Sequence, residues 1–284
     1  MDSDHQETQQ VVSALLKTTL LLVALAACQE TDKGTVVAKR AALKSEGPAV
    51  TMHVRPPVKK KKKRIYLTFD DGPNRGTQKV LHIMQEEEVP VTFFIVGEHV
   101  FASVGQRRTW DSLSMAANIE LCNHSYSHAH NHYAAFYNHP DSVVHDFERS
   151  QDSLQFSNTI CRAPGRNAWR VDTLQFTDLK RSKAAVDSLQ QAGFTIIGWD
   201  LEWEFTPKDL CLVNTADDLL RQIDSVFAYG KTRSPECLVL LAHDQVYADA
   251  DDSTELRYFI KKLKLKDEYE LELVSHYPGI RALP

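Results

Sequence analysis

Two adjacent carboxylates, Asp70 and Asp71, end an apolar segment of this chain and are followed directly by Gly72-Pro73. Neighbouring acids repel each other, so such a pair at the end of a strand usually has divided roles. A metal ion that binds one carboxylate would leave the other free for proton transfer. The alternative interpretation is a structural turn, because Asp-Gly-Pro is ordinary turn chemistry.

Two histidines spaced four residues apart, His124 and His128, could bind the same ion as Asp71. On one helical turn this spacing points both imidazoles the same way. An Asp-His-His set leaves coordination positions open, which is the pattern of a catalytic zinc site, and it also accepts cobalt or nickel. The surrounding histidines are interpreted as surface or loop residues: His130, His132, His139 and His145.

From residue 64 onward, short β-rich runs alternate with amphipathic helical patterns. This alternation indicates repeated βα units around a largely parallel sheet. The expected strands cover residues 65–69, 91–96, 119–122, 159–162, 195–199, 237–242 and 271–274. The expected helices cover residues 78–88, 142–156, 182–192, 215–229 and 254–265.

Polar side chains follow five of these strands at the point where each strand ends. They are Asp70-Asp71, Asn123-His124, Arg162, Asp200 and His243-Asp244. The carboxyl ends of parallel strands share one face of the sheet, where ligands bind. Five such coincidences are difficult to attribute to turns, so we expect one active site at this face.

Four motifs carry a resemblance to a known family. They are Thr68-Phe69-Asp70-Asp71-Gly72-Pro73, His124-Ser125-x-x-His128, Arg162-Ala163-Pro164 and Leu241-Ala242-His243-Asp244. Over roughly residues 64–265 the chain resembles the NodB-homology polysaccharide deacetylases, also called carbohydrate esterase family 4. The resemblance implies an α/β fold, a distorted (β/α) barrel, and a metal-dependent hydrolysis of N-acetyl or O-acetyl groups on a glycan.

The resemblance also implies a role for each matched side chain. The ligands of one divalent metal, zinc above all, would be Asp71, His124 and His128. Asp70 would be the general base for a water that the metal activates. His243 would be the general acid for the leaving amine or alkoxide, and Arg162 would hold Asp70 ionised and oriented.

Two positions depart from the family pattern. Gly165 follows Arg162-Ala163-Pro164 directly, where the family usually has an aromatic residue. The backbone N–H of Gly165 could still serve an oxyanion hole, but the aromatic wall of the substrate site is missing.

Asp200-Leu201-Glu202-Trp203 stands where the family has Asp-x-x-Asp-Trp. Either carboxylate could orient His243 while the other contacts Arg162, and the sequence leaves this open. Trp203 could stack on a sugar face or pack in the core.

Residues 1–27 resemble a bacterial lipoprotein signal peptide. Their apolar run is too short to span a bilayer and ends in Leu25-Ala26-Ala27 before Cys28. In such signals cleavage precedes the cysteine, which is then lipidated. We therefore expect Cys28 to anchor the protein to the membrane of the bacterial cell envelope, with residues 28–62 as a flexible tether and residues 63–284 as the deacetylase domain.

Composition narrows the class of protein further. With 284 residues and a net charge of −5, the chain is not expected to bind nucleic acid, which requires clustered Lys and Arg. Four cysteines lie beyond the tether without any CxxC pair, so a thiolate metal site is not expected. We expect buried free thiols at Cys122, Cys161 and Cys237.

Three hypotheses follow for the function. The first is a membrane-tethered enzyme that deacetylates a polysaccharide. The second is a non-catalytic glycan-binding envelope lipoprotein, and the third is a protein that sequesters metal through the histidine-rich 124–145 stretch. The sequence identifies neither the polysaccharide nor the oligomeric state.

Overall fold

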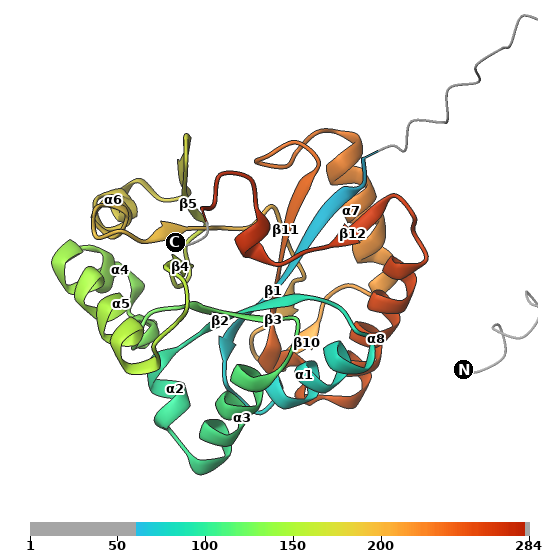
Figure 1. The fold of residues 1–284 in the computed structure, drawn as a ribbon, viewed down its shortest axis with the longest axis horizontal. Helices are drawn as coiled ribbons and strands as arrows, with labels where there is room; N and C mark the ends of the chain where they lie inside the picture. Colours follow the sequence, from blue (N-terminus) through green and yellow to red (C-terminus); the bar gives the residue numbers. More distant parts are fainter. Residues whose placement is uncertain (1–60, 282–284) are drawn as a thin grey trace, which may run out of the picture. The chain divides into compact units, whose positions relative to one another are not determined.

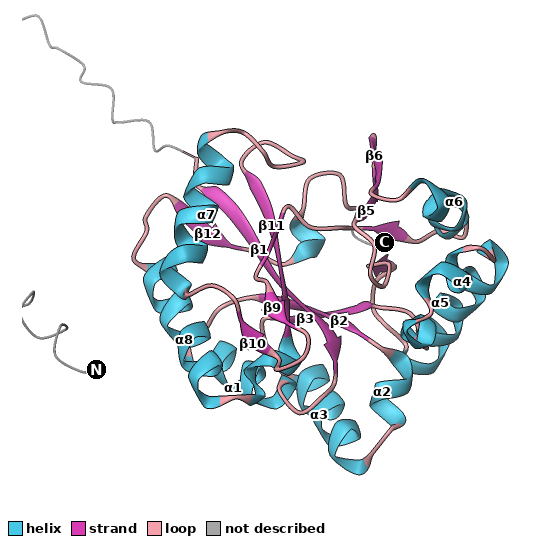
Figure 2. Ribbon diagram, turned by 180° about the vertical axis from the view of Figure 1, so that it is seen from behind, coloured by secondary structure: helices cyan, strands magenta, loops and turns pink. Residues whose placement is uncertain are grey.

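The computed structural model describes residues 61–281 (Figures 1 and 2). Residues 1–60 lie outside this range. They include the expected signal peptide, Cys28 and the expected tether up to residue 60. Within the described residues, no helix combines the length and the apolar character needed to cross a membrane.

A curled and mostly parallel sheet forms the body of the domain, with helices around its outside (Figure 2). The strand order is β6-β5-β7-β4-β3-β2-β1-β11-β8, and β12 also pairs with β1. The bounds are β1 Lys63–Gly72, β2 Val91–Ile95, β3 Ile119–Asn123, β4 Ile160–Cys161, β5 Ala168–Val171, β6 Leu174–Thr177, β7 Thr195–Ile196, β8 Leu201–Glu202, β11 Cys237–His243 and β12 Tyr269–Leu271. Strands β6 and β8 are the two ends of this path, so the barrel is not closed among the described strands. The sheet is therefore the distorted (β/α) barrel that the sequence predicts.

Strand β1 is the centre of the sheet and its middle is fully buried. It pairs in parallel with β2 on one side and with β11 on the other. The register places Asp70 beside His243 at the carboxyl ends of β1 and β11. On the far side of β2, Ile95 pairs with Asn123, the last residue of β3. Chain segments that are distant in the sequence thus end at the same face.

The helices connect the strands and bury one apolar side each. Their bounds are α1 Thr77–Glu86, α2 Gly97–Phe101, α3 Val104–Met115, α4 Tyr133–Tyr137, α5 Pro140–Leu154, α6 Lys183–Gln191, α7 Ala216–Ala228 and α8 Ala250–Lys264. Helix α7 illustrates how the local sequence starts a helix, because Thr215 and Asp218 form a reciprocal capping box at its N-terminus. Its buried residues Leu219, Ile223 and Phe227 recur at helical spacing.

The helices expected from the sequence and all but one of the strands are present, with shifted ends. The expected strand 271–274 is wrong, because β12 covers Tyr269–Leu271 and Val274 begins a 3-10 helix. The expected strands 159–162 and 195–199 are reduced to two residues each, β4 and β7. Helices α2, α3 and α4, strand β8, the β5–β6 hairpin and the small hairpin of β9 (Phe205–Thr206) and β10 (Cys211–Leu212) were not expected. Cys122, Cys161 and Cys237 are buried free thiols as predicted, whereas Cys211 is exposed.

Trp203 is a core residue and not a sugar platform, which corrects its assignment as a substrate contact. Its side chain is 1% exposed, and its ring packs 5.3 Å from the ring of Phe259 and 6.0 Å from that of Tyr247. The indole N–H donates to the backbone oxygen of Asn214 at 3.0 Å. The residue directly follows β8, and its burial supports the strand that carries Glu202.

We predict that Trp203→Ala lowers the free energy of unfolding by about 3 to 5 kcal/mol, the usual range for removing a buried tryptophan. Urea denaturation of the two proteins measures this difference. A loss below about 1 kcal/mol would contradict the core assignment.

Candidate active site

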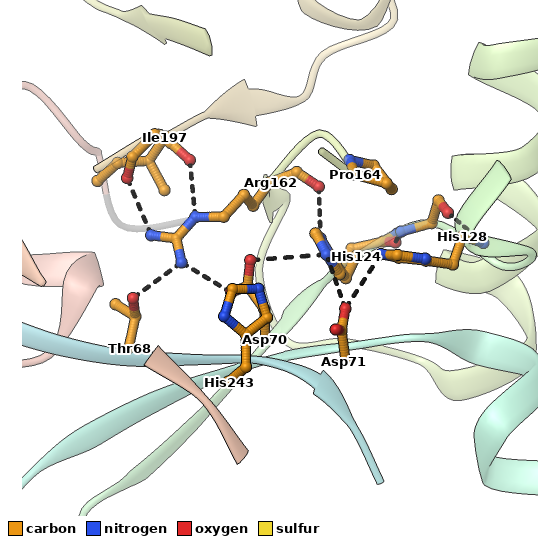
Figure 3. Close-up of polar contacts among 12 residues, drawn as sticks. Thr68, Asp70, Asp71, His124, His128, Arg162, Pro164, Ile197 and His243 are labelled. Carbon is orange, nitrogen blue, oxygen red and sulfur yellow. Dashed lines mark hydrogen bonds and ion pairs between the residues drawn. The ribbon is translucent and has the colours of Figure 1, made fainter. Parts of the chain in front are cut away.

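A cavity of about 570 Å³ opens at the carboxyl ends of the central strands. Six residues predicted from the sequence line it: Asp70, Asp71, His124, His128, Gly165 and His243. Figure 3 shows most of these side chains pointing toward one another, with Arg162 beside them. Asp200 and Trp203, which we also expected at the site, do not line the cavity.

Asp71, His124 and His128 form a group whose ligand atoms all lie within 4.8 Å of one another. Asp71 Oδ1 is 3.0 Å from Nε2 of His128 and 3.5 Å from Nε2 of His124. This oxygen is buried and makes no hydrogen bond to any described residue. Burial raises the pKa of the Asp71 carboxyl, but the contacts with the two imidazoles outweigh burial and hold that pKa well below its usual range.

The orientation of His124 is fixed by a backbone contact. Its Nδ1 lies 2.8 Å from the backbone oxygen of Arg162, which can only accept, so Nδ1 carries the proton. When the ring is neutral, as it is on binding a cation, Nε2 offers its lone pair on the side that faces Asp71. An ionised carboxylate oxygen and two imidazole nitrogens converging on one point are the donor set that zinc prefers, so these residues fit a divalent cation.

The two histidines do not lie on one helical turn, which corrects the local structure expected for them. His124 follows β3 in a loop, and His128 begins the short 3-10 helix η1 (His128–Asn131). Ser125 and His128 have φ values of 65° and 50°, outside the right-handed helical region.

Side-chain hydrogen bonds build this loop in place of a helix. Asn123 Oδ1 accepts from the backbone N–H of Ser125 at 2.9 Å, and Ser125 Oγ accepts from that of His128 at 3.0 Å. From α5, Asp146 Oδ2 accepts from the N–H groups of Tyr126 and Ser127. These local acceptors satisfy the backbone without a helical turn, so the spacing of four arises from a loop.

Arg162 lies fully buried behind the two carboxylates (Figure 3). Its Nη1 donates to Asp70 Oδ1 at 2.7 Å and to Thr68 Oγ1 at 2.8 Å. Its other donors reach the backbone oxygens of Ile197 and Gly198. Asp70 is therefore held by Arg162, while its second oxygen lies 3.6 Å from His124 Nε2.

His243 lies at the end of β11 with Glu202 as its nearest acidic partner. Nδ1 of His243 is 3.9 Å from Glu202 Oε1, which is too long for a hydrogen bond but within ion-pair range. Burial raises the pKa of Glu202, and the nearby His243 partly offsets this. Of the two carboxylates left open by the sequence, Glu202 is the one that faces His243.

Asp200 has a different role from the one expected. Its Oδ1 accepts from the backbone N–H of Arg233 at 2.7 Å, and its Oδ2 accepts from that of Val239 at 2.8 Å. The side chain thus attaches the loop before β11 to the middle of that strand, away from His243. Burial raises the pKa of Asp200 to about 6.

A second network holds the loop that follows Asp71. Asp244 is fully buried and accepts from Asn74 Nδ2 and Thr77 Oγ1. The backbone oxygen of Asp71 in turn accepts from His99 Nδ1 at 2.8 Å. Burial raises the pKa of Asp244 to about 8. This network joins the end of β11 to the turn after β1, so His243 and Asp71 are positioned together.

Several residues of the cavity wall were missed in the sequence. They are Asn131, Tyr133, Phe205, Pro207, Leu210 and Gln245. Glu202, one of the two carboxylates left open by the sequence, also lines the wall. The ring of Phe205 lies 5.0 Å from that of His243. Most of these missed residues lie in η1, α4 and the β9–β10 hairpin, which carry no periodic apolar pattern that could have identified them.

Comparison with known proteins agrees with the motifs. Residues 57–196 match the polysaccharide deacetylase family. Peptidoglycan-N-acetylglucosamine deacetylase of Bacillus cereus is 26% identical over 251 residues, which are 83% of this chain and 80% of that protein.

Two solved structures share the fold. The catalytic domain of peptidoglycan N-acetylglucosamine deacetylase from Eubacterium rectale has a TM-score of 0.54 and 20% identity, covering 80% of this chain and 96% of that one. A Streptococcus mutans CE4 esterase has a TM-score of 0.55 and 23% identity, covering 75% of this chain and 86% of that one. The chain belongs to the NodB-homology polysaccharide deacetylases, carbohydrate esterase family 4.

We predict that Asp200 makes stability depend on pH. The usual pKa of an unfolded aspartate is about 3.9, so between about pH 4 and pH 6 the unfolded chain releases this proton before the folded protein does. The raised folded pKa therefore makes the free energy of unfolding fall as pH rises through this window. Asp200→Asn lacks this contribution. Between pH 4 and pH 7, the free energy of unfolding measured by urea denaturation should therefore decline less in the variant than in the wild type. Equal declines in the two proteins would contradict the prediction.

Proposed function

We propose that this protein is a metal-dependent hydrolase that removes N-acetyl or O-acetyl groups from a polysaccharide. The observation that carries the proposal is the division of two adjacent carboxylates. Asp71 faces His124 and His128, whereas Asp70 is held by Arg162. Membership of the polysaccharide deacetylase family supports the reaction class.

The proposed cation ligands are Asp71, His124 and His128. A divalent ion held there, most commonly zinc at such a donor set, would supply a Lewis acid for an acetyl carbonyl and would lower the pKa of a water molecule toward neutrality. Asp70 accepts the proton of the attacking water, because Arg162 binds and orients one of its oxygens and leaves the second available.

His243 is the proposed general acid. It lines the same cavity as Asp70 and donates a proton to the leaving nitrogen or oxygen. Glu202 stabilises the protonated imidazole across 3.9 Å. The backbone N–H of Gly165, on the cavity wall, is the proposed donor to the negative charge that develops on the carbonyl oxygen.

The two other hypotheses receive less support. A glycan binder requires no base, acid and cation ligands in one cavity, and the residues proposed for all three roles line this one. For metal sequestration, the residues 61–281 contain only one converging group of His, Cys, Asp or Glu ligands, namely Asp71, His124 and His128. His130 lies apart from this group and pairs with Glu98 at the surface.

We further propose an envelope polysaccharide as substrate. The named peptidoglycan deacetylase among the relatives supports an N-acetylglucosamine polymer of the cell wall. The proposed anchor is a lipid on Cys28, which would keep the domain on the membrane beside this polymer. Mass spectrometry of the membrane-extracted protein would show a lipid-modified Cys28 as the first residue under this proposal.

Asp70→Asn should lower acetate release from N-acetylated glycans by about 10² to 10⁴-fold, because the amide cannot accept the proton. Metal content, measured by mass spectrometry of the purified protein, should be unchanged. Asp267→Asn, at an exposed surface position, is the matched control and should retain full activity. Equal activity in wild type and Asp70→Asn would remove the proposed base.

His128→Ala should weaken zinc binding in calorimetric titrations of chelator-treated protein. Because a direct ligand is lost, the weakening should exceed the roughly 10 to 100-fold that removing an outer partner of a metal site costs. His130→Ala is the matched control and should bind zinc like the wild type. The metal-sequestration hypothesis makes the opposite prediction, namely that the loss of His130, His132 and His139 abolishes most binding.

A further inference from the structure

Tyr133 stands on the cavity wall beside a proposed cation ligand. It is the first residue of α4, its side chain is half-buried, and its ring lies 5.8 Å from the His128 ring at nearly a right angle. No motif or periodic pattern of the sequence indicates a role for this residue.

The ring of Tyr133 rests directly on the backbone of Gly165. A Cβ atom at position 165 would lie 3.1 Å from Cε1 and 3.2 Å from Cζ of Tyr133. Gly165 also has a φ of 61°, which side-chain-bearing residues rarely adopt. Any side chain at position 165 would therefore displace this ring, so the glycine and the tyrosine form one unit of the wall.

This unit replaces the aromatic residue that is missing after Arg162-Ala163-Pro164. The ring enters from α4 and occupies the space over Gly165, so the cavity keeps an aromatic wall from a different segment. The hydroxyl of Tyr133 donates to Asn131 Oδ1 at 3.1 Å, which helps to hold the ring in place.

An aromatic wall at this place has a definite use for a carbohydrate. Sugar rings present apolar C–H faces that pack on aromatic side chains, whereas the acetyl group needs the polar centre. The hydrogen-bonded and packed ring loses little conformational freedom on binding, which favours affinity.

We infer that Tyr133 is a specificity-determining residue that packs against a sugar ring of the glycan next to the reacting acetyl group. The inference rests on the proposed function for the identity of the substrate. It assigns to Tyr133 the binding of the glycan and no part in proton transfer or cation binding.

The test compares a sugar substrate with a small ester. In an Asp70→Asn background, which suppresses turnover, Tyr133→Ala should raise the Kd for a tetramer of N-acetylglucosamine about 3 to 10-fold, the equivalent of one aromatic contact. Tyr133→Phe keeps the ring and should bind like the parent. Tyr229→Ala, at an exposed aromatic far from the cavity, is the control. With Asp70 intact, Tyr133→Ala should lower the rate of 4-nitrophenyl acetate hydrolysis by a smaller factor than it weakens tetramer binding, because this ester has no sugar ring to pack on Tyr133.

Each result decides between distinct explanations. Unchanged tetramer binding in Tyr133→Ala would overturn the inference. An equal fall in tetramer binding and ester hydrolysis would also overturn it, because the ring would then act through His128. A wild-type protein that hydrolyses neither substrate would refute the proposed function, while the binding titration would still decide the role of Tyr133.

Discussion

The site depends on the buried guanidinium of Arg162. A charged group without solvent contact costs several kcal/mol unless its donors are paired, and here they reach Asp70, Thr68 and two backbone oxygens. The face of the guanidinium also lies 4.1 Å from the ring of Phe94. The backbone oxygen of the same residue orients His124. One residue of the loop after β4 thus connects the proposed base, one proposed cation ligand and the segment after β7.

This arrangement explains how two neighbouring carboxylates acquire different properties. Successive side chains of a regular strand point to opposite faces, but Asp71 has a φ of 74°, and the pairing of β1 with β2 is irregular between Phe69 and Gly72. Asp70 consequently turns toward Arg162, and Asp71 turns toward the two histidines. The parallel pairing of β1 with β11 adds His243 at the same level. The geometry of the strand ends, together with the buried Arg162, separates the proposed base from the proposed cation ligand.

The sequence predicted the parts of the protein that local rules control. The strands and the helices such as α7 follow apolar periodicity, and the polar residues at strand ends follow from parallel topology. The roles of Asp200 and Trp203 could not be predicted, because both depend on which backbone groups lie nearby after folding. The aromatic wall from Tyr133 depends on a contact with Gly165, which lies 32 residues further along the chain. No periodic pattern of the sequence indicates such a contact. Likewise, the spacing of His124 and His128 was informative, although a loop and not a helix produces it.

A crystal structure of the zinc-loaded protein with anomalous scattering at the zinc edge is the most direct test. The account predicts one strong peak in the cavity, about 2.0 to 2.2 Å from the nitrogens of His124 and His128 and from a carboxylate oxygen of Asp71. Asp70 should remain paired with Arg162 outside the coordination sphere. A peak bound by Asp70, or one located away from these three ligands, would contradict the division of the two carboxylates.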